Sequence, residues 1–445
     1  MASTTRRRAA SAARSSAPAA AAAPGSSSAP SVPQATVAPR LKARQGRAGS
    51  FRLQQLVLIE CAASVLLVAW VLEPLLLVPA GAVAALLVLL AVARRHHRSL
   101  PEWLSTVLAL RARSRKAASL VLPPDTEPGL APAVECDPAL RTCSYSDRDR
   151  RPVGMVGDGT FLTALLQVEP EGTAFRPDRA ARPLPVSLLR DVMDVDGIRL
   201  ESAQIVQHTQ PAPAPHLPPQ SVAARNYAPL QAQTGSPGVR ITWIALKLDP
   251  ELCPEAVAAR GGGVRGAQKC LVRVADQLAS RLTGAGFSAT VLTEQELTSA
   301  IATSTCANPM ATAQASRADV PGRRTHETSR IWRVDDRKHT TYWVGRWPQL
   351  GGRGSAGGAS MPQLVALLTS LPALATTFSL TLGHGDRQEV TVTGHVRITG
   401  RSDEELVSSR HALERAARGV KTGLVRLDHE QLPGMLATLP LGGAR

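Results

Sequence analysis

The most apolar stretch of the chain covers residues 56–93 and is broken once, by Glu73-Pro74. One helix of this length would measure about 57 Å at about 1.5 Å per residue, almost twice the roughly 30 Å of a bilayer core. Pro74 cannot donate a helical hydrogen bond, and it disfavours a helical residue before it. The pattern therefore predicts two membrane spans, 56–72 and 75–93, joined by a tight turn.

Charged residues around this hairpin, residues 53–98, predict its orientation. The basic residues on its two sides are Arg40, Lys42, Arg44, Arg47 and Arg52 before it and Arg94, Arg95 and Arg98 after it. Because the turn carries none, the positive-inside rule places both chain ends in the cytoplasm. Glu60, about one turn inside the first span, is expected to reach the interface. Two buried helices of a soluble core are the alternative interpretation.

Residues 99–120 have the pattern of a basic amphipathic helix. Its apolar residues at helical spacing are Trp103, Leu104, Val107 and Leu108, and its basic residues are Arg111, Arg113, Arg115 and Lys116. This pattern favours a helix that lies on a membrane surface, with anionic lipids as partners. A helix packed on the following domain is the alternative. We expect no nucleic-acid partner, because the basic clusters lie beside the predicted spans.

Composition changes the picture mainly at the N-terminus. The chain has 445 residues and a formal net charge of +16, and residues 1–52 contribute basic residues but no Asp or Glu. The rest of this tail is rich in Ala, Ser and Pro, with too little apolar surface to offset the entropy cost of ordering. We expect a disordered basic tail; an organellar transit peptide has a similar composition and stays open.

Residues 121–445 alternate between strand and helix patterns and are expected to form a cytoplasmic domain. The segment 153–170 predicts a hairpin with a turn at Gly157-Asp158-Gly159, and Pro-rich residues 209–220 predict a stiff loop. Taken with the hairpin, the pattern predicts a membrane-anchored α+β or α/β protein with a mixed sheet.

Two parts of this domain share one layout. Aligning Leu292–Thr303 with Leu427–Thr438 superposes Leu297 on Leu432 and Ile301 on Leu436, and in both places the segment follows a strand. The alignment predicts two related β-α-β-α units.

Candidate chemistry is sparse. Gly261–Gly266 fits G-x-G-x-x-G, but no strand precedes it directly, so a flexible loop before a helix is favoured over a nucleotide site. No P-loop motif is present. Asp194 and Asp196 have the spacing of a metal-binding carboxylate pair in nucleotide-sugar enzymes, but Gly197 makes a turn the preferred interpretation.

The remaining candidates do not form a known motif. The single histidines and the acidic pair in question are His326, His339, His384, His411, His429 and Asp335-Asp336, which are expected on solvated faces and in turns. Of the six cysteines, Cys136 and Cys143 are the only close pair, and their spacing fits no zinc site. We expect free thiols in a cytoplasmic domain. We therefore predict no catalytic, cofactor-binding or metal-binding residue and no cofactor.

The layout resembles that of a known family. A basic tail, an apolar hairpin, "PEWL" followed by basic residues, and "RKHTTYWVGRWP" within an α/β domain are similar to EccE, a core membrane component of the actinobacterial type VII (ESX) secretion system. The resemblance rests on layout and on local patterns such as Tyr342–Pro348. It implies a non-catalytic scaffold in the plasma (inner) membrane that works with EccB, EccC and EccD, where EccC carries the ATPase motor. The missing P-loop agrees with that division of labour.

Two other functions stay open at this point. A membrane-tethered transferase acting on a nucleotide-activated substrate would use Asp194 and Asp196 or Gly261–Gly266. A regulator that binds anionic lipid would use the basic residues from Arg111 to Lys116.

Overall fold

The fold is taken from a computed structural model of the chain. It describes residues 53–73, 77–92, 94–95, 98–123, 126–146, 150–171, 183–210, 220–222, 225–226, 229, 239–317, 322–348, 361–385 and 389–443. The predicted disordered tail, Pro74 of the predicted turn, and residues 211–219 of the Pro-rich loop lie outside the described residues.

Three helices and a small hairpin form the N-terminal part of the described chain. They are α1 (Leu53–Leu72), α2 (Leu77–Val92), β1 (Arg94–Arg95), β2 (Arg98–Ser99) and α3 (Leu100–Ala118). α1 and α2 pack against each other. The segment predicted as an amphipathic helix therefore forms a helix, α3.

The predicted pair of membrane spans is wrong for this structure. Within the described ranges, no helix combines the length and the apolar character needed to cross a bilayer. α2 has 16 residues and measures about 24 Å at about 1.5 Å per residue, less than the roughly 30 Å of a bilayer core. α1 is longer, but Glu60 interrupts it and leaves an unbroken apolar run, 61–72, of about 18 Å.

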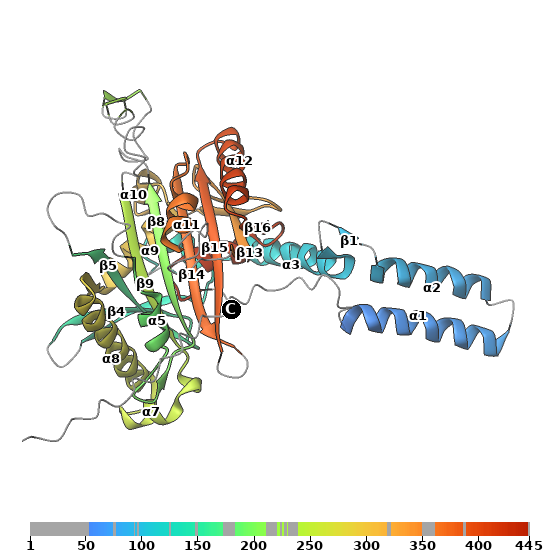
Figure 1. The fold of residues 1–445 in the computed structure, drawn as a ribbon, viewed down its shortest axis with the longest axis horizontal. Helices are drawn as coiled ribbons and strands as arrows, with labels where there is room; N and C mark the ends of the chain where they lie inside the picture. Colours follow the sequence, from blue (N-terminus) through green and yellow to red (C-terminus); the bar gives the residue numbers. More distant parts are fainter. Residues whose placement is uncertain are drawn as a thin grey trace, which may run out of the picture. The chain divides into compact units, whose positions relative to one another are not determined.

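The main sheet contains 12 strands among the described residues. They are β3 (Arg141–Ser146), β4 (Pro152–Gly157), β5 (Leu162–Pro170), β8 (Ser202–Gln210), β9 (Val239–Leu248), β10 (Phe287–Val291), β11 (Thr325–Glu327), β12 (Trp332–Val334), β13 (Arg337–Arg346), β14 (Ala375–His384), β15 (Val390–Gly400) and β16 (Gly423–Arg426). The order is β11-β12-β13-β15-β14-β8-β9-β5-β4-β3, with β10 paired to β5 and β16 to β13. Figure 1 shows β8, β9, β14 and β15 side by side.

The sheet is antiparallel, so the predicted mixed sheet is wrong and the domain is α+β. Every pairing between the described strands of the main sheet is antiparallel. β9 and β10 run in the same direction, as their β-α-β pattern predicts, but β5 lies between them and pairs with both. β13 separates β15 from β16 in the same way. Each unit is thus a split β-α-β motif, in which parallel strands are never neighbours.

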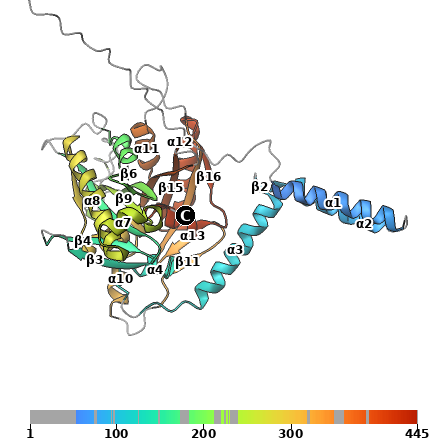
Figure 2. The same cartoon turned by 90° about the horizontal axis from the view of Figure 1, so that it is seen from below.

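Helices cover both faces of this sheet. They are α4 (Ala131–Cys136), α5 (Val186–Asp191), α7 (Pro254–Ala259), α8 (Gly263–Gly284), α9 (Glu294–Thr305), α10 (Pro309–Ala315), α11 (Met361–Thr369), α12 (Asp403–Gly419) and α13 (Gln431–Thr438), with a 3-10 turn η2 (Pro250–Leu252) and a hairpin of β6 (Asp194–Val195) and β7 (Ile198–Arg199). One apolar core joins a sheet face to α5, α7, α8, α11 and α12. The other joins the opposite face to α4, α9 and α13. Figure 2 shows α7 beside α8, which it contacts.

The related units are parts of a larger internal repeat. The first half runs β4-β5-α5-β8-β9-α8-β10-α9, and the second runs β12-β13-α11-β14-β15-α12-β16-α13. In the first half Leu292 N–H donates to Leu165 O at 2.9 Å, and in the second Leu427 N–H donates to Thr341 O at 3.1 Å. Because these contacts occupy corresponding positions, the aligned segments that suggested the repeat take the same place in each half.

Register fixes the correspondence between the halves. In β8 and β9 Ser202 pairs with Lys247, and in β14 and β15 Ala375 pairs with Thr399. Each half also has a pair of buried leucines at the same spacing, Leu271 and Leu278 in α8 and Leu406 and Leu413 in α12. The two halves therefore share one packing plan, and they meet where β8 pairs with β14.

Candidate functional site

The turn between α7 and α8 depends on consecutive glycines. Gly261, Gly262 and Gly263 have φ angles of 108°, 67° and 57°, a region that residues with a Cβ rarely adopt. One turn later, a Cβ on Gly266 would lie 2.4 Å from Val257 O. Glycine at these positions therefore lets the chain reverse direction and brings α7 close to α8. The sequence stretch predicted as a flexible loop is an ordered turn and the first turn of a helix.

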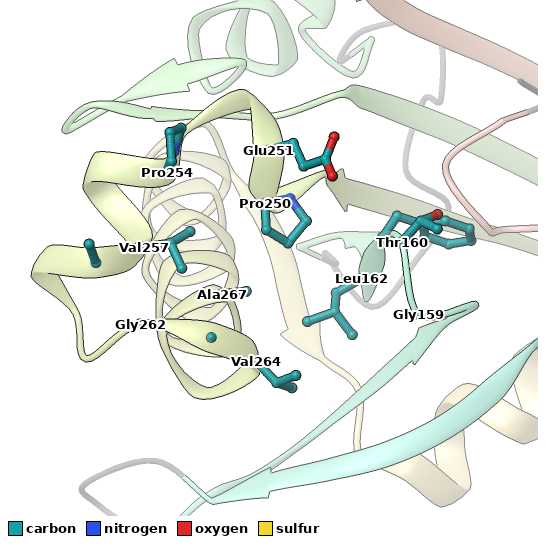
Figure 3. A pocket seen from close by; sticks show the side chains of 13 residues that line it. Gly159, Thr160, Leu162, Pro250, Glu251, Pro254, Val257, Gly262, Val264 and Ala267 are labelled. Atoms are coloured by element: carbon teal, nitrogen blue, oxygen red, sulfur yellow. The ribbon is translucent and has the colours of Figure 1, made fainter.

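A pocket of about 440 Å³ opens between this turn and the hairpin turn that joins β4 to β5. Residues lining it include Leu162, Pro250, Glu251, Val257, Val264 and Ala267. Figure 3 shows Leu162 pointing toward α8 at Val264 and Ala267, whereas the carboxylate of Glu251 points away from that helix. The volume lies in the range of small-ligand sites, and the walls are mainly apolar. The pocket is suited to an apolar group of limited size.

Only the first repeat contains the segment that builds this pocket. By the register, Leu248 corresponds to Gly400. The first half then adds η2 and α7 before α8, whereas α12 begins at Asp403, soon after Gly400. Lys338, which corresponds to Leu162, donates to Asp403 Oδ2 at 2.6 Å. An ion pair thus stands in the second half where the first half has an apolar wall.

A buried lysine supports one wall of the pocket. Lys247 is 3% exposed, and its Nζ lies 4.3 Å from the ring centroid of Phe161, which lines the pocket. The same Nζ donates to Glu201 Oε1 at 3.0 Å. The cation–π contact and the ion pair satisfy the charge and hold the ring in place. Sequence reasoning missed this residue, although a lysine near the end of the apolar strand VRITWIALKL was an available signal.

The glycine segment is not arranged like a nucleotide-binding loop. η2 and α7 separate it from β9, and Lys269 Nζ donates to Arg260 O at 3.0 Å, within the turn itself. A dinucleotide-binding loop follows its strand directly and leaves its backbone donors to the phosphates. The residues of Gly261–Gly266 therefore contribute to an apolar pocket.

Asp194 and Asp196 lie in the β6–β7 hairpin, away from the pocket-lining residues. Asp196 and Gly197 have positive φ angles of 51° and 73°, which is the pattern of a two-residue hairpin turn. Asp196 Oδ2 accepts from Arg273 Nη2 at 2.9 Å, in the middle of α8. No group of three or more His, Cys, Asp or Glu in the described part of the chain could hold a metal ion. The structure therefore places Asp194 in β6 and Asp196 in the turn, and the Asp196 carboxylate forms an ion pair.

A buried polar cluster lies where the two repeats meet. Arg397, in β15, is fully buried, and its guanidinium donates to Ser304 O in the last turn of α9 and to Thr377 Oγ1. His208 Nδ1 lies 2.8 Å from the same hydroxyl. Burial lowers the pKa of Arg397 to about 10, and burial together with Arg397 lowers the pKa of His208 to about 3. The arginine therefore binds carbonyl oxygen at a helix C-terminus, where a cation is favoured.

Other candidates from the sequence have structural partners. Asp335, in the β12–β13 turn, pairs with Arg324 at 2.8 Å. His326 and His411 are exposed, as expected, but His339 is buried and its Nδ1 lies 3.0 Å from Thr399 Oγ1. His339 is buried because it occupies an inward-facing position of β13. A single histidine in the sequence did not indicate this position. All six cysteines are free thiols, and burial raises the pKa of both Cys136 and Cys143.

One family model matches the chain. Its description is "Putative type VII ESX secretion system translocon, EccE", and it covers residues 236–344. The match confirms the resemblance to the EccE family. The EccE match includes all of β9 and ends within β13, and it contains every pocket-lining residue except those at positions 159–162, in the β4–β5 turn and at the start of β5. By its description, the matched family is a component of the type VII secretion translocon. No curated protein matches the chain.

Proposed function

We propose that the protein is a non-catalytic structural subunit of the type VII secretion membrane complex, with EccB, EccC and EccD as its partners. In this proposal the pocket of the first repeat receives an apolar side chain from a neighbouring subunit. The α+β domain braces that subunit at the cytoplasmic face of the plasma membrane. The EccE match supports the assignment to the type VII secretion system. The apolar pocket supports a contact made through an apolar side chain of a partner.

The observation that carries this proposal is the repeat-specific pocket. Both halves share strands, helices and register, yet the segment that lines the pocket is inserted in one half only. That segment lies inside the EccE match. An insertion that opens an apolar pocket leaves apolar surface in water, which costs free energy unless something covers it. A partner side chain would recover that free energy.

The chemistry of the described groups favours binding over catalysis. The pocket offers apolar walls, and the carboxylate of Glu251 points away from α8. The cluster around Arg397 directs its donors at carbonyl and hydroxyl groups of the fold. A general acid or base must reach a substrate within hydrogen-bond distance, and neither group of residues is placed for that.

A photo-crosslinking residue at position 264 tests the proposal in the native membrane complex. Val264 lines the pocket and is 68% exposed, so a reactive side chain there can contact a docked partner without disturbing the core. We expect an adduct with another translocon subunit. The matched control is the same residue at position 407, on the exposed side of α12, where Val407 is 42% exposed. Equal adducts from both positions, or none from position 264, would contradict a docking role for the pocket.

A further inference from the structure

One side of α3 fixes this helix to the main domain. Arg113 donates from Nε and Nη2 to the carboxylate of Glu327, at 2.9 and 3.0 Å, and from Nη2 to His429 O at 2.7 Å. Glu327 is buried and also accepts from Leu432 N–H at 2.9 Å. The Trp103 ring meets the His429 ring edge-on, with 6.2 Å between centroids. α3 is therefore held against the start of α13 by its own charged and aromatic side chains.

The opposite side of α3 carries a stripe of four exposed residues. At about 3.6 residues per turn, Leu104, Leu108, Arg111 and Arg115 share one line along the helix, on the side away from Arg113. All four are exposed, and the two leucines have exposed fractions of 51% and 53%. We call these four residues the α3 stripe. Its N-terminal half is apolar and its C-terminal half is basic.

The acidic residue of α3, Glu102, lies in the first turn of the helix, and no other acidic residue balances the charge of the α3 stripe along the helix. The sequence has no Asp or Glu from Trp103 to Pro124, and exposed Lys116 adds a third positive charge beside Arg115. Within the described residues, none of the ion pairs includes Arg111, Arg115 or Lys116. The surface therefore combines two exposed leucines with a concentrated positive charge.

We propose that the α3 stripe binds the surface of an anionic lipid bilayer. Leu104 and Leu108 enter the boundary between headgroups and acyl chains, while the long side chains of Arg111 and Arg115 reach lipid phosphates. Two leucines one turn apart form a shallow ridge, which a bilayer can accept anywhere on its surface. An acidic protein partner would match the arginines but would need its own pocket for the leucines. This inference goes beyond the subunit proposal and does not depend on it.

Binding of the full-length protein to vesicles tests the inference. The vesicles contain phosphatidylcholine with about 30 mol% phosphatidylglycerol, or phosphatidylcholine alone, in low and high salt. The stripe variant is Arg111→Gln/Arg115→Gln. The matched control is Arg265→Gln/Arg281→Gln, which removes the same charge from exposed positions on α8. Both variants keep residues 1–52, so any contribution of that basic segment cancels in the comparison.

We expect the stripe variant to bind the anionic vesicles about 25-fold more weakly than the control, since each basic residue near an anionic surface contributes about fivefold. Leu104→Gln/Leu108→Gln should also weaken vesicle binding. The size of this loss should depend less on the salt concentration than the loss in the stripe variant. The substituted residues are exposed, so the unfolding midpoint should not change, and a folded variant can be verified. Equal binding of the stripe and control variants would overturn the inference. So would loss of a translocon subunit from the stripe variant with vesicle binding intact, which would assign the stripe to a protein partner.

Discussion

Val206 in β8 pairs with Ser379 in β14, and the register makes these two residues equivalent positions of the two repeats. Where a residue pairs with its own counterpart, the axis that relates the halves passes between the two. The domain is thus organised like a two-fold dimer whose halves are joined in one chain. The axis passes through the middle of the sheet, between α9 and α13 on one face.

The two halves cap the helices near this axis in different ways. Arg397 corresponds to Ala245 and donates to Ser304 O of α9. On the other side, Gln204 Nε2 and Ser379 Oγ donate to Ala437 O of α13, at 3.0 and 2.8 Å. The carbonyl oxygen near the end of α13 thus accepts from neutral donors, whereas the one near the end of α9 accepts from a buried cation. Both halves therefore supply a donor at this place, but the donors differ in charge.

Replacing the buried arginine measures the strength of this contact. We expect Arg397→Ala to lower the free energy of unfolding by about 3 kcal/mol, because Ser304 O loses a charged donor and a cavity replaces the side chain. Urea unfolding followed by circular dichroism measures the change. Arg415→Ala, on the exposed side of α12, should stay within about 0.5 kcal/mol of the unsubstituted protein. A similar effect of both substitutions would mean that Arg397 does not hold α9.

Acid should destabilise the domain through its buried histidines. The pKa of His208 falls from 6.5 to about 3 in the folded protein because of burial and the nearby Arg397. The unfolded chain therefore binds more protons between pH 6.5 and pH 3, so stability is complete above pH 6.5 and declines as the pH falls through this window. At pH 5 the loss from His208 is about 2 kcal/mol.

Substitution of His208 isolates its share of this pH dependence. Unfolding free energies measured from pH 7 to pH 4 should decline less steeply for His208→Gln than for the unsubstituted protein. Burial also lowers the pKa of His395, to about 4, so part of the slope should persist. His411→Gln replaces an exposed histidine and serves as the control. A slope for His208→Gln that parallels the control would show that His208 is not protected from protonation.

Local patterns in the sequence predicted much of the domain. The alternation in 153–170 gave the β4–β5 hairpin, and the match between Leu292–Thr303 and Leu427–Thr438 pointed to the repeat. Both signals are short-range: a turn sequence, a strand and the helix that follows it. The prediction of a mixed sheet was wrong because the strand between β9 and β10 is β5, which lies far earlier in the chain. Such non-local pairing leaves little trace in a local pattern.

The candidate site could be predicted only in part. Gly261–Gly266 was noticed for its glycines, yet its role depends on α7 folding back so that Val257 approaches Gly266. The pocket also needs Leu162 from a distant hairpin. The apolar residues 56–93 predicted two spans from the length of the run and its break at Glu73-Pro74. The observed helix bounds and Glu60 break that stretch into shorter apolar runs.

Thermal unfolding with nucleotide sugars and Mg²⁺ or Mn²⁺ tests the transferase alternative. We expect no rise in the thermal unfolding midpoint with these ligands, because Asp196 already pairs with Arg273 and the pocket walls are mainly apolar. Asp194→Asn/Asp196→Asn keeps a side chain that tolerates the turn, and it should leave secretion unchanged. A clear rise in the midpoint that this double variant abolishes would restore the enzymatic alternative.

The most direct test of the pocket compares two matched substitutions in the native complex, Val264→Glu in the pocket and Val407→Glu on α12. Both place a carboxylate on an exposed helical valine, at 68% and 42% exposure, so both should fold. A charge in the pocket must be desolvated when an apolar partner side chain docks. Co-purification of the other translocon subunits from detergent extracts should therefore fall at least tenfold for Val264→Glu and stay unchanged for Val407→Glu. Full co-purification with Val264→Glu would contradict the claim that this pocket joins the protein to its complex.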